Sequence, residues 1–575
     1  MARDARGSES IRCRVISYLA VLKFKTNCSK EKIDMHCRVT KAMAIVAASA
    51  MTLLPAAPAF ARDRDDFKTT TPIKHVVVIF QENVSFDHYF GTYPHAANLP
   101  GETPFHAKDD TPRANTLEAA GLLTNNPNKV NPFRIPPSVP VTCDEDHNYN
   151  DEQAAFDGGL MDNFTKVSCN DAVLGANSTM GYYDGNTVTA FWNYAQHFAM
   201  NDNSFGTTFG PSTPGAVNLI SGNTFPATLA PLKANGKASS PAGQIAGGSA
   251  DSTVTVAAVV GDPRPHLDDC TQTTPGLAGA NQITMGGKNV GDLLNAQGIT
   301  WGWFHGGFAP TGVDAKGRAV CGQHHSGLAG DDAVTQSSNG DYIPHHEPFQ
   351  YYPSTVNAHH TRPSDPALIG TSKDGANHQY DLTDFFTALN EGRLPAVSFL
   401  KAGAYQDGHA GYSDPIDEQI FLVNTINAIM QSDEWRETAI IINYDDSDGW
   451  YDHQMGPIVN HSNVPLDDEL LGNGNCGTPR ASDVSGGTQN GRCGYGPRLP
   501  LIVISPFAKS NYIDHRVTDQ SSILRFIEDN WNLGRIGNGS TDAIAGTLNG
   551  LFDFDEGAHN HRLILDPQTG LTLPE

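Results

Sequence analysis

Residues 74–91 read KHVVVIFQENVSFDHYFG. The run Val76–Phe80 is continuous, apolar and rich in β-branched side chains, a pattern typical of a strand that is buried on both faces of a parallel sheet. The strand ends abruptly at Gln81, Glu82 and Asn83. Open α/β sheets bind their ligands at the carboxyl ends of the strands, and a carboxylate beside a carboxamide offers oxygen ligands for a metal ion. Taken alone, these residues fit a metal site and an ordinary polar strand end about equally well.

The composition restricts the classes of protein to consider. The chain has 575 residues, of which 63 are acidic and 38 are basic, for a net charge of -25. This balance argues against binding to nucleic acid and against docking on anionic lipid. No apolar run reaches about 18 residues without a break or a cleavage signal, so we expect no stable membrane span. The oligomeric state stays open.

The N-terminus has the pattern of an export signal. Residues 1–34 are basic and lack periodicity, and a second methionine, Met35, precedes an apolar stretch over 42–54. The sequence Ala59-Phe60-Ala61 then provides a small-x-small cleavage site. We therefore predict that translation starts at Met35, that residues 1–61 are an extension plus a secretory signal peptide, and that residues 62–575 form one exported domain, periplasmic or secreted. A membrane anchor is the alternative.

Cleavage would leave six cysteines, and an even number in an exported chain predicts disulfides. Six cysteines allow ~15 pairings. We prefer pairs that are neighbours in the sequence, because each pair brackets a loop rich in Gly and Asn; they are Cys143–Cys169, Cys270–Cys321 and Cys476–Cys493. No cysteine or histidine spacing suggests zinc.

Further apolar runs alternate with helical patterns. The expected strands are 299–304, 396–400, 438–443 and 499–504, and the expected helices start near Gly291, at Asp414-Pro415 and at Asp519. This alternation predicts an α/β fold, with a mostly parallel central sheet and helices on both faces. Three segments, about 92–185, 223–285 and 306–380, lack the pattern, and we predict long loops that form a cap or the wall of an active site.

Asp445 and Asp446 follow an isoleucine-rich strand in the way that Glu82 and Asn83 follow a valine-rich one. If the two strands are near neighbours, three carboxylates and one amide converge at one edge of the sheet. Carboxylates in a dry crevice repel each other unless a cation lies among them. A single Asp-Asp pair is usually a loop turn, but two such strand ends favour metal binding.

Ser212 lies in the sequence FGPSTPG, residues 209–215. Pro214 fits the first position of a helix, with Thr213 as its cap. A serine at this place faces free backbone N–H groups, which suit a phosphate or an oxyanion. A metal ion beside it would lower the pKa of its hydroxyl and make it a nucleophile. The alternative is that Ser212 and Thr213 only cap the helix.

Four histidines stand in polar contexts: His147, His345, His346 and His409. A histidine can protonate a leaving oxygen or bind phosphate oxygens. For any one of them alone, an ordinary surface position is the alternative.

Together these motifs resemble the bacterial phosphoesterase family that contains the non-specific phospholipases C and the AcpA-type acid phosphatases, in the alkaline-phosphatase-like superfamily. The resemblance covers the chain from Ile73 to Pro567 and implies that residues 62–575 are a phosphoesterase catalytic domain. It rests on the motifs 82–91, 210–212, 345–346, 445–449, 496–500 and 505–506.

The resemblance implies that Glu82, Asn83, Asp445, Asp446 and Ser212 bind one divalent metal ion of unknown identity. It also implies that Ser212 is the nucleophile and that the four histidines surround the phosphate. Two positions depart from the pattern. Val84 stands where the commonest motif has arginine, so the role of that arginine is absent. The nucleophile is a serine, as in the acid phosphatases, where many phospholipases C have threonine.

We therefore expect a metal-dependent acid phosphatase that hydrolyses small phosphomonoesters through a phosphoserine, with His346 or His409 assisting the leaving alcohol. The acidic charge, and an end at Glu575 that leaves no room for the extra β domains of the longer phospholipases, favour this reading. Protonated histidines are expected to provide positive charge, which predicts an optimum on the acid side of neutral. The alternative is a phospholipase C that cleaves phospholipid diesters. A third reading, an exported protein that only binds phosphorylated ligands, would have been favoured by loss of Glu82 or Asp446.

Overall fold

The computed structural model describes residues 68–574, except 231–241, 250–251, 276, 279–280, 329–339 and 560–561. The chain divides into two units, Met1–Asp66 and Phe67–Glu575, and everything below concerns the second unit. The predicted leader, residues 1–61 with its start at Met35, lies outside the described residues. Its boundaries therefore stay a prediction.

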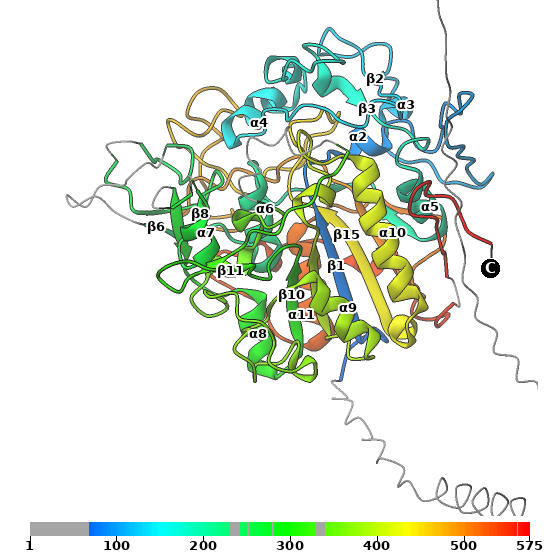
Figure 1. Cartoon of the computed structure of the whole chain (residues 1–575). Coiled ribbons are helices and arrows are strands. Elements are labelled where there is room, and N and C mark those ends of the chain that lie inside the picture. Colours follow the sequence, from blue (N-terminus) through cyan, green and yellow to red (C-terminus); the bar gives the residue numbers. More distant parts are fainter. Residues whose placement is uncertain are drawn as a thin grey trace, which may run out of the picture. The chain divides into compact units, whose positions relative to one another are not determined.

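An eight-stranded sheet forms the centre of this unit (Figure 1). Its strands, in spatial order, are β13 (Gln379–Asp381), β10 (Trp301–His305), β14 (Val397–Lys401), β1 (His75–Gln81), β15 (Thr438–Tyr444), β16 (Leu501–Ile504), β4 (Ala199–Asn201) and β17 (Tyr512–Asp514). β16 runs antiparallel to both of its neighbours, and the other neighbouring pairs are parallel. The predicted α/β fold with a mostly parallel sheet is confirmed.

β1 is a central strand, as its unbroken apolar run predicts. Ile79 pairs with Leu400 of β14 on one side and with Ile442 of β15 on the other, and Val76–Phe80 is buried. Because both faces of β1 are covered, polar residues appear only where the strand leaves the sheet. That point is Glu82 and Asn83.

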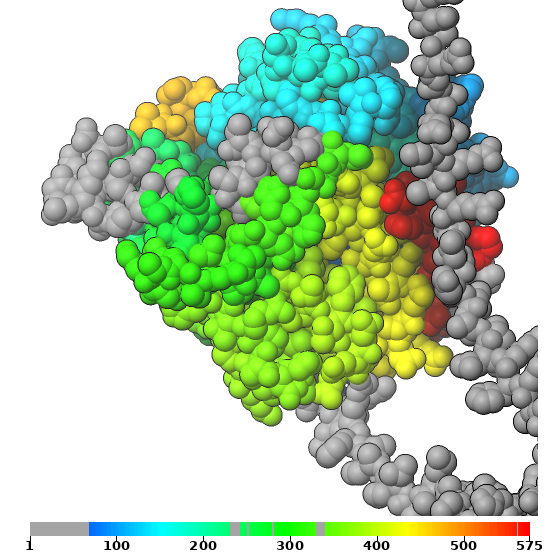
Figure 2. Space-filling model, viewed as in Figure 1, coloured from blue at the N-terminus to red at the C-terminus, as the bar shows by residue number. Residues whose placement is uncertain are grey.

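Helices cover both faces of the sheet. In Figure 1, α9 (Leu382–Asn390) and α10 (Pro415–Gln431) lie in front of the sheet, and α11 (Gln520–Trp531) lies behind it, where it packs against α6 (Ser212–Ser221). In Figure 2 yellow-green and yellow atoms, the colours of α9 and α10, cover most of the front face of the sheet. α10 begins as predicted, with Pro415 at its first position and Asp414 accepting hydrogen bonds from the N–H groups of Ile416 and Asp417. Among the described residues, no helix combines the length and the apolar character that a membrane crossing requires.

The segments predicted as long loops carry short elements. A second, four-stranded sheet has the order β7 (Val256–Ala257), β6 (Ala227–Ala230), β9 (Gln282–Met285) and β8 (Arg264–Pro265). The segment 223–285, predicted as a long loop, therefore contains four short strands, and the prediction was wrong in that part. Strands of two to four residues are too short to show an alternating pattern. The remaining helices and strands are α2 (Phe86–Phe90), α3 (Leu117–Ala120), α4 (Tyr149–Phe156), α5 (Thr189–His197), α7 (Asp269–Thr273), α8 (Val290–Gln297), β2 (Phe133–Arg134), β3 (Gly181–Tyr182), β5 (Ser204–Phe205), β11 (Gly312–Val313), β12 (Ala319–Val320) and β18 (Thr518–Asp519).

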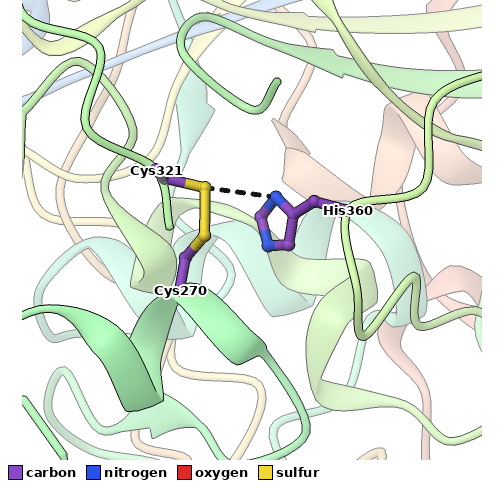
Figure 3. Close-up of side chains that lie close together, drawn as sticks. All are labelled: Cys270, Cys321 and His360. Carbon is purple, nitrogen blue, oxygen red and sulfur yellow. Dashed lines mark hydrogen bonds between the residues drawn. A yellow bond between two sulfur atoms is a disulfide. The ribbon is translucent and has the colours of Figure 1, made fainter. Parts of the chain in front are cut away.

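Three disulfides join the cysteines in the predicted pairs, Cys143–Cys169, Cys270–Cys321 and Cys476–Cys493. Figure 3 shows the second pair beside His360, whose Nδ1 atom lies 3.3 Å from the sulfur of Cys321. Two sulfurs and an imidazole could in principle ligate a metal ion, but these sulfurs are bonded to each other. The group is therefore a buried disulfide with a histidine packed against it.

Candidate active site

Four adjacent parallel strands, β10, β14, β1 and β15, end at the same edge of the sheet. Polar residues at or just after these ends meet there: His305 on β10, Lys401 on β14, Glu82 with Asn83 after β1, and Asp445 with Asp446 after β15. Because β1 and β15 are direct neighbours, the two predicted pairs of ligand residues come together as expected.

The turn after β1 is fixed by hydrogen bonds to the turn after β15. Asn83 has a φ of 62°, in the left-handed region that asparagine tolerates better than most residues. Its backbone N–H donates to Oδ1 of Asp445 at 3.0 Å, and its side-chain amide donates to Oδ1 of Asp448 at 2.9 Å. This leaves two side-chain oxygens, Oδ1 of Asn83 and Oδ2 of Asp445, buried without a hydrogen-bond partner among the described residues. Buried oxygens of this kind are uncommon and suit a cation.

Ser212 lies beside these carboxylates. Its Oγ donates to Oε2 of Glu82 at 2.9 Å and lies 3.3 Å from Oδ2 of Asp446. The first turn of α6 reaches this place because Gly215 packs against the backbone of Asp445, and a Cβ atom there would lie 2.2 Å from the Asp445 carbonyl oxygen. A glycine at this position therefore allows the helix to bring Ser212 to the strand ends.

The predicted start of α6 needs correction. The helix begins at Ser212 with Pro211 as its N-cap, rather than at Pro214 with Thr213 as the cap. The preference of proline for the first turn is satisfied by Pro214 two positions later, so it did not fix the boundary. The expectation of free backbone N–H groups is also wrong for Thr213, because its N–H donates to Oδ1 of Asp262 at 2.9 Å.

The carboxylates perturb one another. Burial raises the pKa of Glu82 well above its usual value, and the charge of Asp445 raises it further. Burial and Asp445 likewise raise the pKa of Asp446. Burial also opposes ionisation of Asp445, but Lys401 and hydrogen bonds outweigh it and lower the pKa of that group. Carboxylates that resist ionisation in a dry cluster gain from a bound cation, which favours their charged forms.

A cavity of about 630 Å³ opens onto Ser212. Its lining includes three of the predicted histidines, His147, His345 and His409, together with Arg264 on β8. The other lining residues are Asp144, Glu145, Asp146, Asn148, Lys166, Val167, Ser168, Cys169, Pro211, Asp262, Gly340, Ile343, Ala404 and Tyr412. The wall around Ser212 therefore carries both basic and acidic side chains.

His147 and His409 differ in charge. His147 lies 3.4 Å from Asp448 and 3.6 Å from Asp144. Burial lowers the pKa of His147, but nearby carboxylates outweigh it and hold the pKa well above its usual value. Burial lowers the pKa of His409, whose Nδ1 atom contacts the carbonyl oxygen of Ala410 at 2.6 Å. His147 is therefore the cation of this pair, and His409 is mostly neutral near pH 7.

His345 and His346 are neighbours in the sequence but have different partners: an arginine contacts His345, and carboxylates lie beside His346. Arg264 contacts Nδ1 of His345, and burial together with this arginine lowers the pKa of His345 far below its usual value. His346 is buried with its Nδ1 3.2 Å from Oε1 of Glu82, and burial lowers its pKa strongly as well. The expectation that protonated histidines supply positive charge therefore fits His147 only, because burial lowers the pKa values of His345, His346 and His409.

Sequence reasoning missed several residues of the site. Lys401 forms an ion pair with Glu82. Burial disfavours the charge of Lys401, but Glu82 and Asp445 raise its pKa, so it is a cation.

Glu152 is a second residue that was missed. It accepts hydrogen bonds from the Gly210 N–H and from Ser447 Oγ, both at 2.8 Å, and so links the two loops of the site. Lys401 directly follows an apolar run, which was a usable signal. Arg264 and Glu152 lie in segments without periodicity and gave no signal.

The model of the phosphoesterase family matches residues 73–534. A non-hemolytic phospholipase C of Burkholderia pseudomallei is 23% identical over 481 residues, which are 81% of this chain and 56% of that protein. Phospholipase C B of Mycobacterium tuberculosis is 23% identical over 80% of this chain and 73% of its own length. The chain thus spans little more than half of the Burkholderia relative.

Among solved structures, a protein in the alkaline phosphatase superfamily from Vibrio parahaemolyticus aligns over 82% of this chain and 72% of its own. The TM-score is 0.26 and the identity is 11%. A likeness this distant supports no conclusion about the chain.

Proposed function

This chain belongs to the phosphoesterase family, and we propose that it is an exported, metal-dependent hydrolase of phosphoric esters with Ser212 as its nucleophile. The observation that carries the proposal is the position of Ser212 Oγ, 2.9 Å from Glu82 and 3.3 Å from Asp446 at the floor of the cavity. A serine that only capped its helix would point to backbone N–H groups instead.

The metal ligands in this proposal are Glu82, Asn83, Asp445, Asp446 and the hydroxyl of Ser212. The donor set fits a divalent ion, because it consists of oxygens, includes three carboxylates and contains two buried oxygens without a partner among the described residues. When bound, such an ion stabilises negative charge on phosphate oxygens and favours the ionised serine.

The side chains of the site then have separate tasks. The Ser212 hydroxyl gives its proton to Oε2 of Glu82, which accepts its hydrogen bond, and Oγ bonds to phosphorus. The bond to the alcohol breaks as a histidine protonates the leaving oxygen, and water then hydrolyses the phosphoserine. Arg264 and the imidazolium of His147 line the cavity and supply positive charge to the phosphoryl group. His346 and His409 are the two histidines expected to assist the leaving alcohol. Of these, His409 lines the cavity and His346 does not, so we assign this role to His409.

We propose phosphomonoesters as substrates and an optimum on the acid side of neutral. Because burial lowers the pKa of His409, the protonated form that can donate to an alcohol is populated at acid pH. The phospholipases C among the relatives favour a second candidate, cleavage of phospholipid diesters. The three disulfides support export, since such bonds persist in oxidising compartments.

One comparison separates the two substrate classes. The enzyme is assayed from pH 4 to 9 with an aryl phosphate, with the matching diaryl phosphate and with phosphatidylcholine vesicles at one enzyme concentration. Faster turnover of the monoester with a maximum below pH 7 supports the phosphatase. Faster turnover of the phospholipid would contradict the phosphatase proposal and support a phospholipase C.

A further inference from the structure

The carboxylate of Glu82 has two different sides. Oε2 accepts the hydrogen bond from Ser212, on the side of Asp446. Oε1 forms the ion pair with Lys401 and lies 3.2 Å from Nδ1 of His346. One carboxylate therefore separates the proposed metal position from a second polar position on its far side.

This second position has the donors of a cation site. Glu82, His346 and Asp407 each offer one ligand atom, these atoms lie within 4.8 Å of one another, and all three side chains are buried. Oδ2 of Asp407 lies 3.8 Å from Nδ1 of His346. That Nδ1 atom is buried and finds no hydrogen-bond partner among the described residues. Two carboxylates and one imidazole suit a borderline ion such as Zn²⁺.

The ammonium group of Lys401 already lies at this position. Lys401 is the last residue of β14, next to β1, and its side chain is 1% exposed. Its Nζ also lies 5.6 Å from the centre of the Phe80 ring, so the side chain is held against the β1 strand. Glu82, Asp407, Asp445 and Asp446 are four buried carboxylates. If all four are ionised, one ammonium and one divalent ion leave one net negative charge. A second divalent ion at this position would have to displace the lysine, because Nζ of Lys401 is already paired with Oε1 of Glu82.

We propose that Lys401 is a built-in cation that limits this centre to one divalent ion, and that removal of its ammonium opens a second divalent-cation site formed by Glu82, His346 and Asp407. The inference rests on the proposed one-metal centre. It assigns Lys401 a positioning role, because the lysine acts through Glu82 and the metal content rather than on the substrate.

The test counts metal ions and does not depend on activity. Wild type and Lys401→Ala are stripped with a chelator, dialysed against buffered Zn²⁺ and analysed for zinc per chain by mass spectrometry, with circular dichroism as a check of folding. We expect one tightly bound zinc in wild type and two in Lys401→Ala. Lys401→Arg, which keeps the positive charge, and Lys509→Ala, which removes another lysine near an aromatic ring, should each bind one.

A double variant identifies where the extra zinc binds. Lys401→Ala/Asp407→Asn should return to one zinc, since the second position then lacks a carboxylate. If Lys401→Ala does not fold, Lys401→Gln, which keeps a hydrogen-bond donor for Glu82, carries the same expectation. One zinc in a folded charge-removing variant, or two in wild type, overturns the inference. A wild type that binds no zinc would instead contradict the metal centre of the proposed function.

Discussion

Ser212 and Glu82, from the start of α6 and the end of β1, meet in a hydrogen bond of 2.9 Å from Oγ to Oε2. Two segments far apart in the sequence are thus joined where the sheet, the helix and the carboxylate cluster meet. Both residues are buried, and Ser212 also lines the cavity.

Asp446→Asn should weaken metal binding and turnover together. The variant keeps the shape of the side chain, and its oxygen can still accept the Asp448 N–H, but one negative charge is lost. We expect at least about a tenfold fall in metal affinity, as for changes around other metal sites. Titration calorimetry with the stripped protein measures the affinity. Asp467→Asn is the control, since Asp467 binds the Gly247 N–H away from the site; equal affinities in all three proteins would remove Asp446 from the ligands.

Arg264→Gln should weaken binding of the phosphate group. Burial lowers the pKa of Arg264 despite the opposing charge of Asp262, so its cation is incompletely compensated and gains from a bound anion. Loss of a charge-assisted hydrogen bond costs about 1.5–3 kcal/mol, roughly a tenfold to hundredfold fall in kcat/KM. Steady-state kinetics measure kcat/KM, and inhibition by inorganic phosphate measures binding of the phosphate group. Arg264→Lys should lie between wild type and Arg264→Gln, and phosphate inhibition that is the same in all three would contradict the role.

Glu418→Gln should change how stability depends on pH. Glu418 accepts hydrogen bonds from Tyr89 and Tyr444, and burial raises its pKa to about 8 from 4.5. Its folded-state pKa exceeds the unfolded value, so its contribution is full below pH 4.5 and is lost as the pH rises through 8. Between these values the free energy of unfolding of wild type should fall relative to the variant, by up to about 1.4 kcal/mol per pH unit. Urea unfolding at several pH values tests this, and two parallel curves would count against a neutral Glu418.

The three disulfides should be present in the exported protein. Peptide mapping without reduction should recover Cys143–Cys169, Cys270–Cys321 and Cys476–Cys493. Replacing both Cys476 and Cys493 by serine should cost about 3 kcal/mol, the loop-closure value for a short loop. A free thiol at any of the six positions in the purified protein would contradict the set.

The strands and their polar ends were predictable because both faces of β1 and β15 are buried. Burial of this kind leaves unbroken apolar runs, and the polar residues that follow mark the edge of the sheet. The pairing of β1 with β15 was not predictable, since long segments separate them and only the register observed in the structure joins Gln81 to Tyr444. Even so, the guess that the two strands lie close together was sufficient to group Glu82 with Asp446.

The charges of the site were not predictable from the sequence. The place of Lys401 directly after an apolar run marks it as a residue at the edge of the sheet, but its burial against Glu82 is seen only in the structure. Arg264 comes from a strand of two residues, far from the motifs. The histidines look alike in the sequence, but their pKa values shift in opposite directions: nearby carboxylates outweigh burial at His147, whereas burial prevails at His345 and His409.

The turnover of Ser212→Ala tests the central claim most directly. The variant is compared with wild type and with Ser221→Ala, a serine at the other end of α6, using an aryl phosphate at the pH optimum. Metal content and circular dichroism are measured on the same samples. We predict that Ser212→Ala keeps its fold but loses at least about three orders of magnitude in kcat, the usual scale for a lost covalent nucleophile, while Ser221→Ala stays active. A folded Ser212→Ala that retains more than about a tenth of wild-type activity would contradict the account.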